Sequence, residues 1–336
     1  MIPPAAIDLI RNSANPLLVS HVNPDGDALG SLLGMGWMLD SLGKKSTLAL
    51  QDAVPPEYST LPGADRIVGV EAVADVYDLI ICLDASSQDR MGKVYKAEHE
   101  PTPLLVIDHH VTNTRFGTVN WVASECAATC QMLVELADAL AISLQGALAQ
   151  CLLTGLVTDT LCFRTSNTTP AVLETAMRLM QGGANLNNIT ENMLDRRPYS
   201  VLRLWGMVLN DVQMADGVIW ASISRAQFAA SGGDNQDDGS LSSVLIRTVG
   251  AKISASFIEK MDESGQPTVE CSFRARRGYD ISTVALALGG GGHPAAGGCT
   301  VSGALADVIA HVTPMLKAVC LAVETAATTA KSAFAD

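Results

Sequence analysis

The first half of the chain alternates short apolar runs with longer helical patterns. Four apolar runs have the length of strands, and they lie at residues 16–21, 45–50, 77–83 and 103–107. Helical patterns lie between or after them, at residues 28–42, 125–140, 144–157 and 170–181. Continuously apolar strands that alternate with helices are typical of a parallel sheet that is covered on both faces. The first half therefore predicts an α/β domain with helices on both faces of its sheet.

The second half has a different pattern. Residues 185–210 are helical in pattern, with Pro198 at the start of a new segment. Strand patterns follow at 217–223, 251–259 and 268–274, a polar and turn-rich stretch at 231–240 predicts a loop, and a glycine run occupies 289–292. These features predict a smaller α/β domain that is joined to the first by a helical connector.

The 336 residues are enough for two domains, each with its own core. The alanine-rich end of the chain lacks a pattern that would anchor it, so we expect it to fray. The predicted boundaries are 1–184 for the parallel-sheet domain, 185–210 for the connector, 211–325 for the smaller domain and 326–336 for the frayed tail.

Composition narrows the class of protein. Hydrophobic residues make up 48% of the chain and charged residues 17%, which indicates a globular protein. No apolar run approaches the roughly 20 residues of a membrane span, and the N-terminus lacks the pattern of a signal peptide. We therefore expect a soluble cytoplasmic protein without a membrane partner. The eight cysteines lie mostly in apolar runs, which predicts buried free thiols.

The formal net charge of −13 changes the picture of possible partners. Proteins that coat long nucleic acids usually present a basic face, which this balance does not favour. A small pocket that uses a few arginines to bind a short substrate remains compatible with an acidic chain.

Acidic residues and histidines gather directly after the predicted strands. In open parallel sheets, sites form beyond the carboxyl ends of the strands, so these residues are expected to share one crevice. A turn or a helix cap explains any single group, but their joint occurrence favours a site. The groups at strand ends are His21, Asp25 and Asp27 after the first strand, Asp84 after the third, and Asp108, His109 and His110 after the fourth. A fourth group, which contains Asp159, follows the helix at 144–157 and so is not placed in the crevice by this argument.

So many carboxylates in one crevice would repel one another and raise their pKa values. Divalent metal ions remove this repulsion. A mixture of carboxylate and imidazole ligands suits Mn²⁺ better than Ca²⁺, and the residues are numerous enough for two ions. Two metals about 4 Å apart can activate a water molecule for an in-line phosphoryl displacement. The sequence thus predicts two divalent metal ions, with Mn²⁺ as the favoured metal.

These four groups resemble, in order and spacing, the four motifs of the DHH phosphoesterase family, which is named for the triplet at 108–110. Residues 289–294 resemble the signature of the DHH-associated C-terminal domain, and residues 272–276 resemble its arginine strand. The resemblance covers about residues 12 to 302. It implies that one ion is held by His21 and Asp25, that the other is held by Asp27 and His109, that Asp84 bridges them and that Asp159 completes the shell.

The resemblance also implies roles outside the metal shell. Asp108 would orient a histidine, and His110 would contact the scissile phosphate or assist the leaving oxygen. In the second domain, glycines would let the backbone approach a phosphate, and cationic side chains would add charge-assisted hydrogen bonds. The alternative is that the glycine run is only a loop and the arginines a solvated face. The predicted substrate-binding residues are Arg247, Arg274, Arg276, Gly291, Gly292 and His293.

The short layout resembles the nano-RNase and pAp-phosphatase branch of the family. This implies hydrolysis of short RNA oligonucleotides, of linear dinucleotides or of 3′-phosphoadenosine 5′-phosphate (pAp). One alternative is a RecJ-like single-strand exonuclease, although the chain has no room for the extra oligonucleotide-binding barrel of that branch. The other is a non-catalytic nucleotide-binding relative. The sequence does not rank the substrates, and it leaves homodimerisation open.

Overall fold

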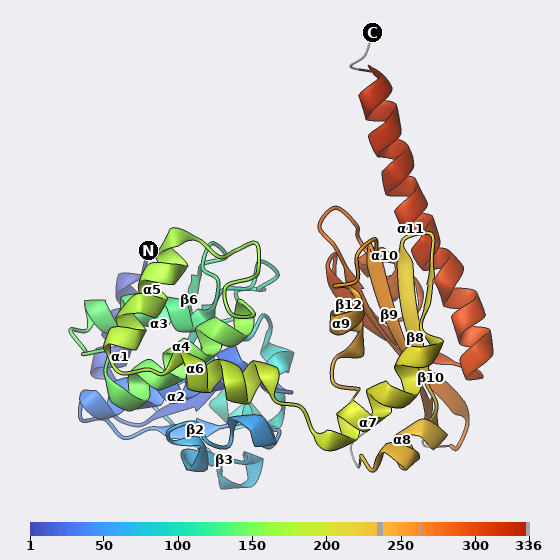
Figure 1. Cartoon of the computed structure of the whole chain (residues 1–336). Coiled ribbons are helices and arrows are strands. Elements are labelled where there is room, and N and C mark those ends of the chain that lie inside the picture. The colour runs from blue at the N-terminus through green and yellow to red at the C-terminus, as the bar shows by residue number, and fades with distance from the viewer. Residues whose placement is uncertain (234–237, 263, 334–336) are drawn as a thin grey trace. The chain divides into compact units, whose positions relative to one another are not determined.

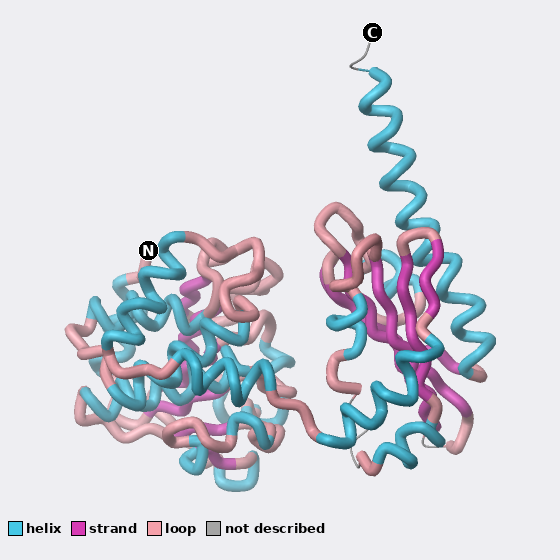
Figure 2. The backbone as a smooth tube through the Cα atoms, viewed as in Figure 1, coloured by secondary structure: helices cyan, strands magenta, loops and turns pink. Residues whose placement is uncertain are grey.

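The chain is described by a computed structural model that covers residues 1–233, 238–262 and 264–333. It divides into two compact units, Met1–Arg196 and Arg197–Asp336. Figure 1 shows the first in blue to green and the second in yellow to red, and Figure 2 marks their helices and strands. The predicted connector, 185–210, falls on both sides of this division. The predicted domain boundaries stay predictions.

The first unit contains a six-stranded sheet in which every pair of neighbouring strands is parallel. This confirms the predicted α/β class. The order is β3-β2-β1-β4-β5-β6. The two strands that the pattern did not predict, β3 and β6, are short and only partly buried, so neither forms a continuous apolar run. The strands are β1 (Pro16–Val19), β2 (Thr47–Ala49), β3 (Ile67–Val68), β4 (Leu79–Leu83), β5 (Leu104–Asp108) and β6 (Val119–Val122).

The strand order reverses between β1 and β4. From β1 the chain moves to β2 and β3 on one side, and β4, β5 and β6 then build the other side. Because β1 and β4 are paired with Val19 opposite Cys82, the loops that follow them emerge next to each other. Such a reversal is where open α/β sheets form ligand-binding crevices.

The two faces of this sheet are covered differently. One face packs against α-helices, whereas the other packs against short 3₁₀ segments such as η3 (Val70–Ala72) and η4 (Gln88–Val94). The prediction of helices on both faces therefore holds for α-helices on one face only, because the connections from β2 to β3, from β3 to β4 and from β4 to β5 contain only short 3₁₀ segments. The helices of this unit are α1 (Pro4–Asn12), α2 (Gly26–Ser41), α3 (Thr129–Ala139), α4 (Gly146–Asp159), α5 (Pro170–Gln181) and α6 (Leu186–Ile189), followed by the π-helical turn η6 (Thr190–Asp195).

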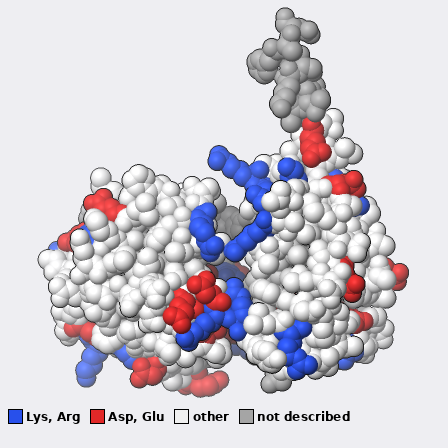
Figure 3. Space-filling view, viewed as in Figure 1, with Lys and Arg blue, Asp and Glu red and all other residues white. Residues whose placement is uncertain are grey.

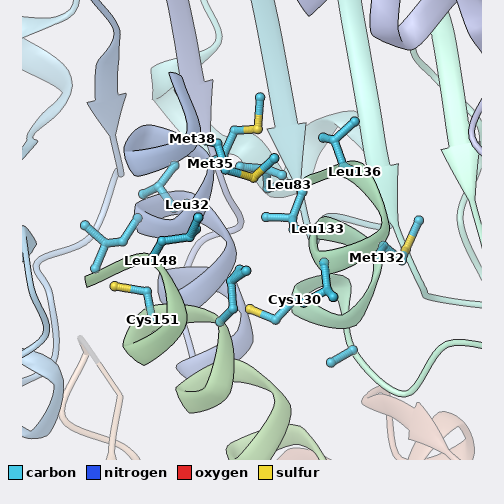
Figure 4. Packing of buried hydrophobic residues seen from close by; sticks show 14 of the residues in the cluster. Leu32, Met35, Met38, Leu83, Cys130, Met132, Leu133, Leu136, Leu148 and Cys151 are labelled. Carbon is cyan, nitrogen blue, oxygen red and sulfur yellow. The ribbon is translucent and has the colours of Figure 1, made fainter. Parts of the chain in front are cut away.

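Helices α2 and α4 pack with almost no space between their backbones. A Cβ atom on Gly30 would lie 2.6 Å from the carbonyl oxygen of Cys151, and one on Gly26 would lie 2.2 Å from Oγ1 of Thr158. Around this contact, Figure 4 shows the interlocking leucine, methionine and cysteine side chains of α2, α3 and α4. The close contact brings the start of α2 next to the end of α4. All eight cysteines are free, and all except Cys162 are buried, as predicted.

The second unit contains a mixed six-stranded sheet of order β11-β12-β10-β9-β8-β7. Only β8 and β9 are parallel neighbours. Helices α7, α8 and α9 pack on one face, and α10 and α11 pack on the other. The bounds are α7 (Tyr199–Val208), η7 (Leu209–Asp211), β7 (Gln213–Ala215), β8 (Val218–Ile223), α8 (Arg225–Ser231), α9 (Leu241–Leu245), β9 (Ile253–Met261), β10 (Pro267–Ala275), α10 (Ser282–Ala287), β11 (Gly291–His293), β12 (Ala296–Ser302) and α11 (Leu305–Ala333).

Two predicted segments, a loop and the tail, lie partly outside the described residues. Part of the predicted loop at 231–240 lies outside them, since residues 234–237 are not described. The backbone of the predicted frayed tail, 326–336, is helical as far as Ala333, and residues 334–336 lie outside the described residues.

Helix α11 corrects one expectation from the sequence. Its window Leu305–Thr325 is long and apolar enough to cross a membrane by length and composition. Polar and charged residues such as Asp307 and Lys317 interrupt the apolar positions, so the window does not stand out as a continuous run. In the structure 28% of this window is buried, along a stripe that packs against the second sheet through Val308, Val312, Leu316 and Cys320.

Candidate active site

The structure gathers the predicted metal ligands beyond the carboxyl ends of β1, β4 and β5. Seven residues form three overlapping groups in which one potential ligand atom of each residue lies within 4.8 Å of the others. Asp84 and His109 each belong to two groups. The groups are His21, Asp25 and Asp84; Asp27, His109 and Asp159; and Asp84, His109 and His110.

The loop after β1 positions the first ligands. Asp25 is the N-cap of α2, and its Oδ1 accepts hydrogen bonds from the amides of Asp27 and Ala28 at 3.0 Å each. The buried ring of His21 lies with Nδ1 2.8 Å from the carbonyl oxygen of Val22. Its Nε2 faces the carboxylates, at 3.8 Å from Asp25 and 3.6 Å from Asp84. This orientation leaves Nε2 as the nitrogen that could bind a metal ion.

Asp27 is held by the start of a helix that lies far away in sequence. The amide of Thr129 donates to its Oδ2 at 2.6 Å, and the amide of Cys130 donates to its Oδ1 at 3.0 Å. These are the first two residues of α3. A helix N-terminus stabilises a negative charge, and these two amides hold the buried carboxylate of Asp27 in a fixed orientation.

Asp84 lies at the centre of the cluster. It directly follows β4 with a left-handed backbone, at φ 58°, a conformation that aspartate tolerates better than most residues. Only 2% of the residue is exposed. Burial and the charge of Asp27 raise the pKa of Asp84 well above its ordinary value, against the opposing hydrogen bond of His21. Its ionised form therefore needs a compensating positive charge.

Asp108 connects two neighbours and does not belong to the three ligand groups. Its Oδ1 lies 2.7 Å from Nδ1 of His110, and its Oδ2 accepts a hydrogen bond from Asn113 at 2.6 Å. Burial alone would raise the pKa of Asp108, but His110 and Asn113 hold it below its ordinary value. In turn, the hydrogen bond that His110 donates to Asp108 raises the pKa of His110. The geometry therefore allows Asp108 to orient and charge His110, as the resemblance implies.

Asp159 is the last residue of α4 and approaches the cluster from the helical side. Its Oδ2 lies 3.5 Å from Nε2 of His109, which is also 3.5 Å from Asp84 and 3.8 Å from Asp27. Burial and the charges of Asp27 and Asp84 raise the pKa of Asp159 to about 9. Several carboxylates and imidazoles with this spacing fit divalent metal ions, whose charge offsets the repulsion.

In the second unit, the predicted arginines have different surroundings. Arg274 is half-buried on β10, and its Nη1 donates to the carbonyl oxygen of Phe273 at 2.9 Å. Arg276 donates from Nε to the carbonyl oxygen of Ala251 at 3.0 Å and from Nη2 to that of Ile246 at 3.2 Å. Arg276 thus fixes the backbone between α9 and β9, a contact that the sequence did not indicate.

Two residues of the glycine run, Gly291 and Gly292, lie in a strand. The sequence alone had allowed either a phosphate-binding run or a loop. Gly291 and Gly292 lie in β11 and pair with β12. Gly292 has a φ of 143°, and a Cβ atom there would lie 2.4 Å from the carbonyl oxygen of Ala296. Close strand pairing therefore explains this glycine without a ligand. The glycines, His293 and Arg247 are exposed.

The register of the second sheet relates Arg274 to His293. Ala296 of β12 pairs with Arg274 on one side and with His293 on the other. Residues opposite one another on neighbouring strands point to the same face of a sheet. Arg274 and His293 therefore share a face, two strands apart. Arg247 is not part of this row.

Several contacts of the cluster were not predicted from the sequence. The amides of Thr129 and Cys130 were missed because the helix was expected to begin at residue 125, which would have satisfied them within the helix. The contact of Asn113 with Asp108 had only a weak signal in the sequence, since Asn113 is a polar residue five positions after Asp108. Arg90, whose Nη2 lies 3.0 Å from Nδ1 of His21, gave none.

Comparison with known proteins identifies the family. Residues 16–156 match the DHH family, N-terminal domain. Over 300 residues the chain is 36% identical to the bifunctional oligoribonuclease and PAP phosphatase NrnA of Thermus thermophilus, which covers 88% of this chain and 87% of that protein. The chain belongs to the DHH family.

Two further proteins extend the likeness over both units. The Bacillus subtilis protein of the same name is 25% identical and covers 85% of this chain and 88% of its own length. A solved structure, an exopolyphosphatase-related protein from Bacteroides fragilis, matches with a TM-score of 0.88 at 23% identity, over 96% of this chain and 99% of that chain. The Thermus and Bacillus proteins confirm the predicted resemblance, and the Bacteroides structure shows that the fold is shared.

Without metal, this DHH protein should become less stable as the pH rises from 6.5 to about 9. Burial lowers the pKa of His21, but Asp25 and Asp84 outweigh this and raise it from 6.5 to about 10. The pKa of Asp159 rises from 3.8 to about 9. In this window the folded chain holds protons that the unfolded chain has released, so raising the pH favours unfolding.

Divalent ions replace these protons, so Mn²⁺ should raise the melting temperature more at the upper end of the window than at the lower end. Thermal unfolding in chelator and in MnCl₂, across the window, measures both effects. Asp159→Asn should weaken the pH dependence in chelator. A melting temperature in chelator that stays constant across the window would contradict the pKa shifts.

Proposed function

We propose that the chain is a metal-dependent phosphoesterase that hydrolyses short oligoribonucleotides and pAp to mononucleotides. The observation that carries the proposal is the set of three overlapping ligand groups at the reversal point of the parallel sheet. The substrate class comes from the Thermus thermophilus relative, named as an oligoribonuclease and PAP phosphatase. In Figure 3 most of the visible surface is uncharged, which suits a short substrate better than a long nucleic acid.

The proposed cofactor is a pair of Mn²⁺ ions. His21 and Asp25 would hold one ion, and Asp27, His109 and Asp159 would hold the other. Asp84 would bridge the two, which agrees with its membership in two ligand groups. When bound, such ions supply Lewis-acid activation of the attacking water and of the phosphoryl oxygens.

The protein's own acid chemistry is assigned to His110. Asp108 accepts from Nδ1 and favours the protonated imidazole, so Nε2 can donate a proton to the leaving oxygen. Asn113 holds the second oxygen of Asp108 and fixes the carboxylate plane. This arrangement keeps the proton on the histidine until the phosphorus–oxygen bond breaks.

The second unit is proposed to bind a phosphate or chain end remote from the scissile bond. Arg274 and His293 share one face of the sheet and can both donate to phosphate. Arg276 has less to contribute, because two of its donors already bond the backbone. Binding energy from such a remote contact can assist the chemical step.

Arg274→Ala should lower kcat/KM for dinucleotides and pAp far more than for a small chromogenic phosphodiester. The small compound reaches only the metal centre, whereas the natural substrates also need the remote contact. A charge-assisted hydrogen bond is worth roughly 1.5–3 kcal/mol, which corresponds to about ten- to a hundredfold. Steady-state kinetics on both substrate types measure the difference.

Lys260→Ala is the matched control, because it removes a cation of the same sheet whose partner is Glu270. It should leave both rates close to wild type, since exposed ion pairs contribute little. An equal loss on both substrate types in Arg274→Ala would mean that Arg274 supports the fold, and the remote contact would be rejected.

A substrate panel tests the function itself. Purified protein with Mn²⁺ would be incubated with labelled dinucleotides, five-residue oligoribonucleotides, a long RNA, a long single-stranded DNA and pAp. We expect metal-dependent release of mononucleotides from the short substrates and pAp. Preferred cleavage of the long strands would favour the RecJ-like exonuclease. Binding of the short substrates without turnover would favour the non-catalytic relative.

A further inference from the structure

Thr129 contacts two carboxylates that belong to different ligand groups. Its amide donates to Oδ2 of Asp27 at 2.6 Å, and its hydroxyl donates to Oδ1 of Asp84 at 3.0 Å. Asp27 is grouped with His109 and Asp159, whereas Asp84 belongs to both of the other groups. Thr129 is fully buried. One residue therefore connects the two parts of the cluster.

The direction of these hydrogen bonds is fixed by the chemistry of the groups. The hydroxyl of Thr129 donates to Asp84, and a carboxylate that binds a metal ion is ionised and only accepts, so this direction also holds in a metal-bound cluster. That bond occupies one lone-pair direction of Oδ1. Oδ2 of Asp84 lies 3.6 Å from Nε2 of His21 and keeps its lone pairs for other partners. The bond thus restricts rotation of the carboxylate that is proposed to bridge two ions.

Thr129 is not explained as an ordinary helix cap. The N-cap of α3 is Ala128, which has no side-chain cap hydrogen bond. The first turn is capped by Asp27, a residue 102 positions earlier in the sequence. The threonine hydroxyl instead points to Asp84. Its β-branched side chain is stiff, and α3 packs in the core of the first unit, so the hydroxyl is held at a fixed place.

We propose that Thr129 is a positioning residue that orients the carboxylate of Asp84 and thereby sets the affinity of the cluster for divalent ions. The inference rests on the proposed function, because it takes the cluster to be a metal centre. It extends that function to a residue outside the ligand set. Partners that orient metal ligands typically change metal affinity by about 10- to 100-fold when they are replaced.

The test compares Thr129→Val with Thr129→Ser in the full-length, metal-free protein. Valine keeps the shape and the backbone amide but removes the hydroxyl, whereas serine keeps the hydroxyl and removes the methyl group. Titration calorimetry with MnCl₂ should show an affinity about 10- to 100-fold weaker for Thr129→Val and close to wild type for Thr129→Ser. Thr154→Val is the matched control, because Thr154 is also fully buried and its hydroxyl donates to Gln150 within α4.

The outcomes separate this inference from the proposed function. Unchanged Mn²⁺ affinity in Thr129→Val, with a wild type that binds Mn²⁺, overturns the role of Thr129 alone. Equal weakening in the valine and serine variants shows that keeping the hydroxyl does not preserve the affinity, and it also overturns that role. A wild type that binds no divalent ion overturns both proposals. If Thr129→Val does not fold, as judged by thermal unfolding in chelator, Thr129→Ala takes its place against Thr129→Ser.

Discussion

Asp84→Ala is expected to abolish turnover while the protein stays folded. Asp84 is buried at the centre of the cluster and belongs to two of the three ligand groups, so both proposed ions lose a ligand in this variant. Lewis-acid stabilisation of the transition state is worth several kcal/mol, which corresponds to a loss of about a thousandfold or more. The measurement is kcat/KM on a labelled dinucleotide with Mn²⁺.

The same substitution should not lower the melting temperature of the metal-free protein. The raised pKa of Asp84 means that its ionised form is unfavourable in the fold, so its removal relieves repulsion from Asp27. Thermal unfolding in chelator tests this, with the exposed Asp65→Ala as a control for a harmless loss of a carboxylate. A folded Asp84→Ala protein that retains more than a few per cent of the wild-type rate would refute the bridging assignment.

His110→Ala is expected to reduce the rate by about a hundredfold and to leave the metal content unchanged. The imidazole is proposed to deliver a proton to the leaving oxygen, and the hydrogen bond that it donates to Asp108 favours its protonated form. Turnover and elemental analysis of the same preparation measure the two effects together. A loss of rate with full metal content separates acid catalysis from metal binding.

His109→Ala provides the contrast, because Nε2 of His109 lies within 3.8 Å of three carboxylates. It should lose both activity and bound metal. The comparison is informative because His110 also belongs to a ligand group, with Nδ1 3.7 Å from Oδ1 of Asp84. If His110→Ala loses one ion per chain, His110 is a metal ligand and the proton must come from elsewhere.

The parts of the fold that were predictable are those that depend on local patterns. Buried strands such as β4 show a continuous apolar run, and α5 begins at Pro170 and ends before two glycines, as its sequence indicates. The cluster was predictable because carboxyl ends of parallel strands meet at one edge. The roles of the individual site residues stay predictions.

What could not be predicted depends on contacts between distant segments. The true start of α3 depends on Asp27, which binds amides that the sequence alone would place inside the helix. The sequence predicts Arg276 as a phosphate ligand, because it does not show that two of its donors bond backbone carbonyl oxygens. The spacing of Gly292 resembles a phosphate loop, yet the backbone opposite it on β12 requires a glycine there.

The contact between α2 and α4 has a consequence for how this enzyme can vary. Asp27 lies at the beginning of one helix and Asp159 at the end of the other, and a missing side chain at Gly30 sets how close the two backbones come. The distance between the backbones that carry the two carboxylates is thus set by the contact of the main chains. A single methyl group added at Gly30, deep in the hydrophobic interior, would push the two helices apart and move the residues of the reaction centre. For this reason a larger residue at Gly30 is expected to disturb the candidate metal site as well as the packing of the core.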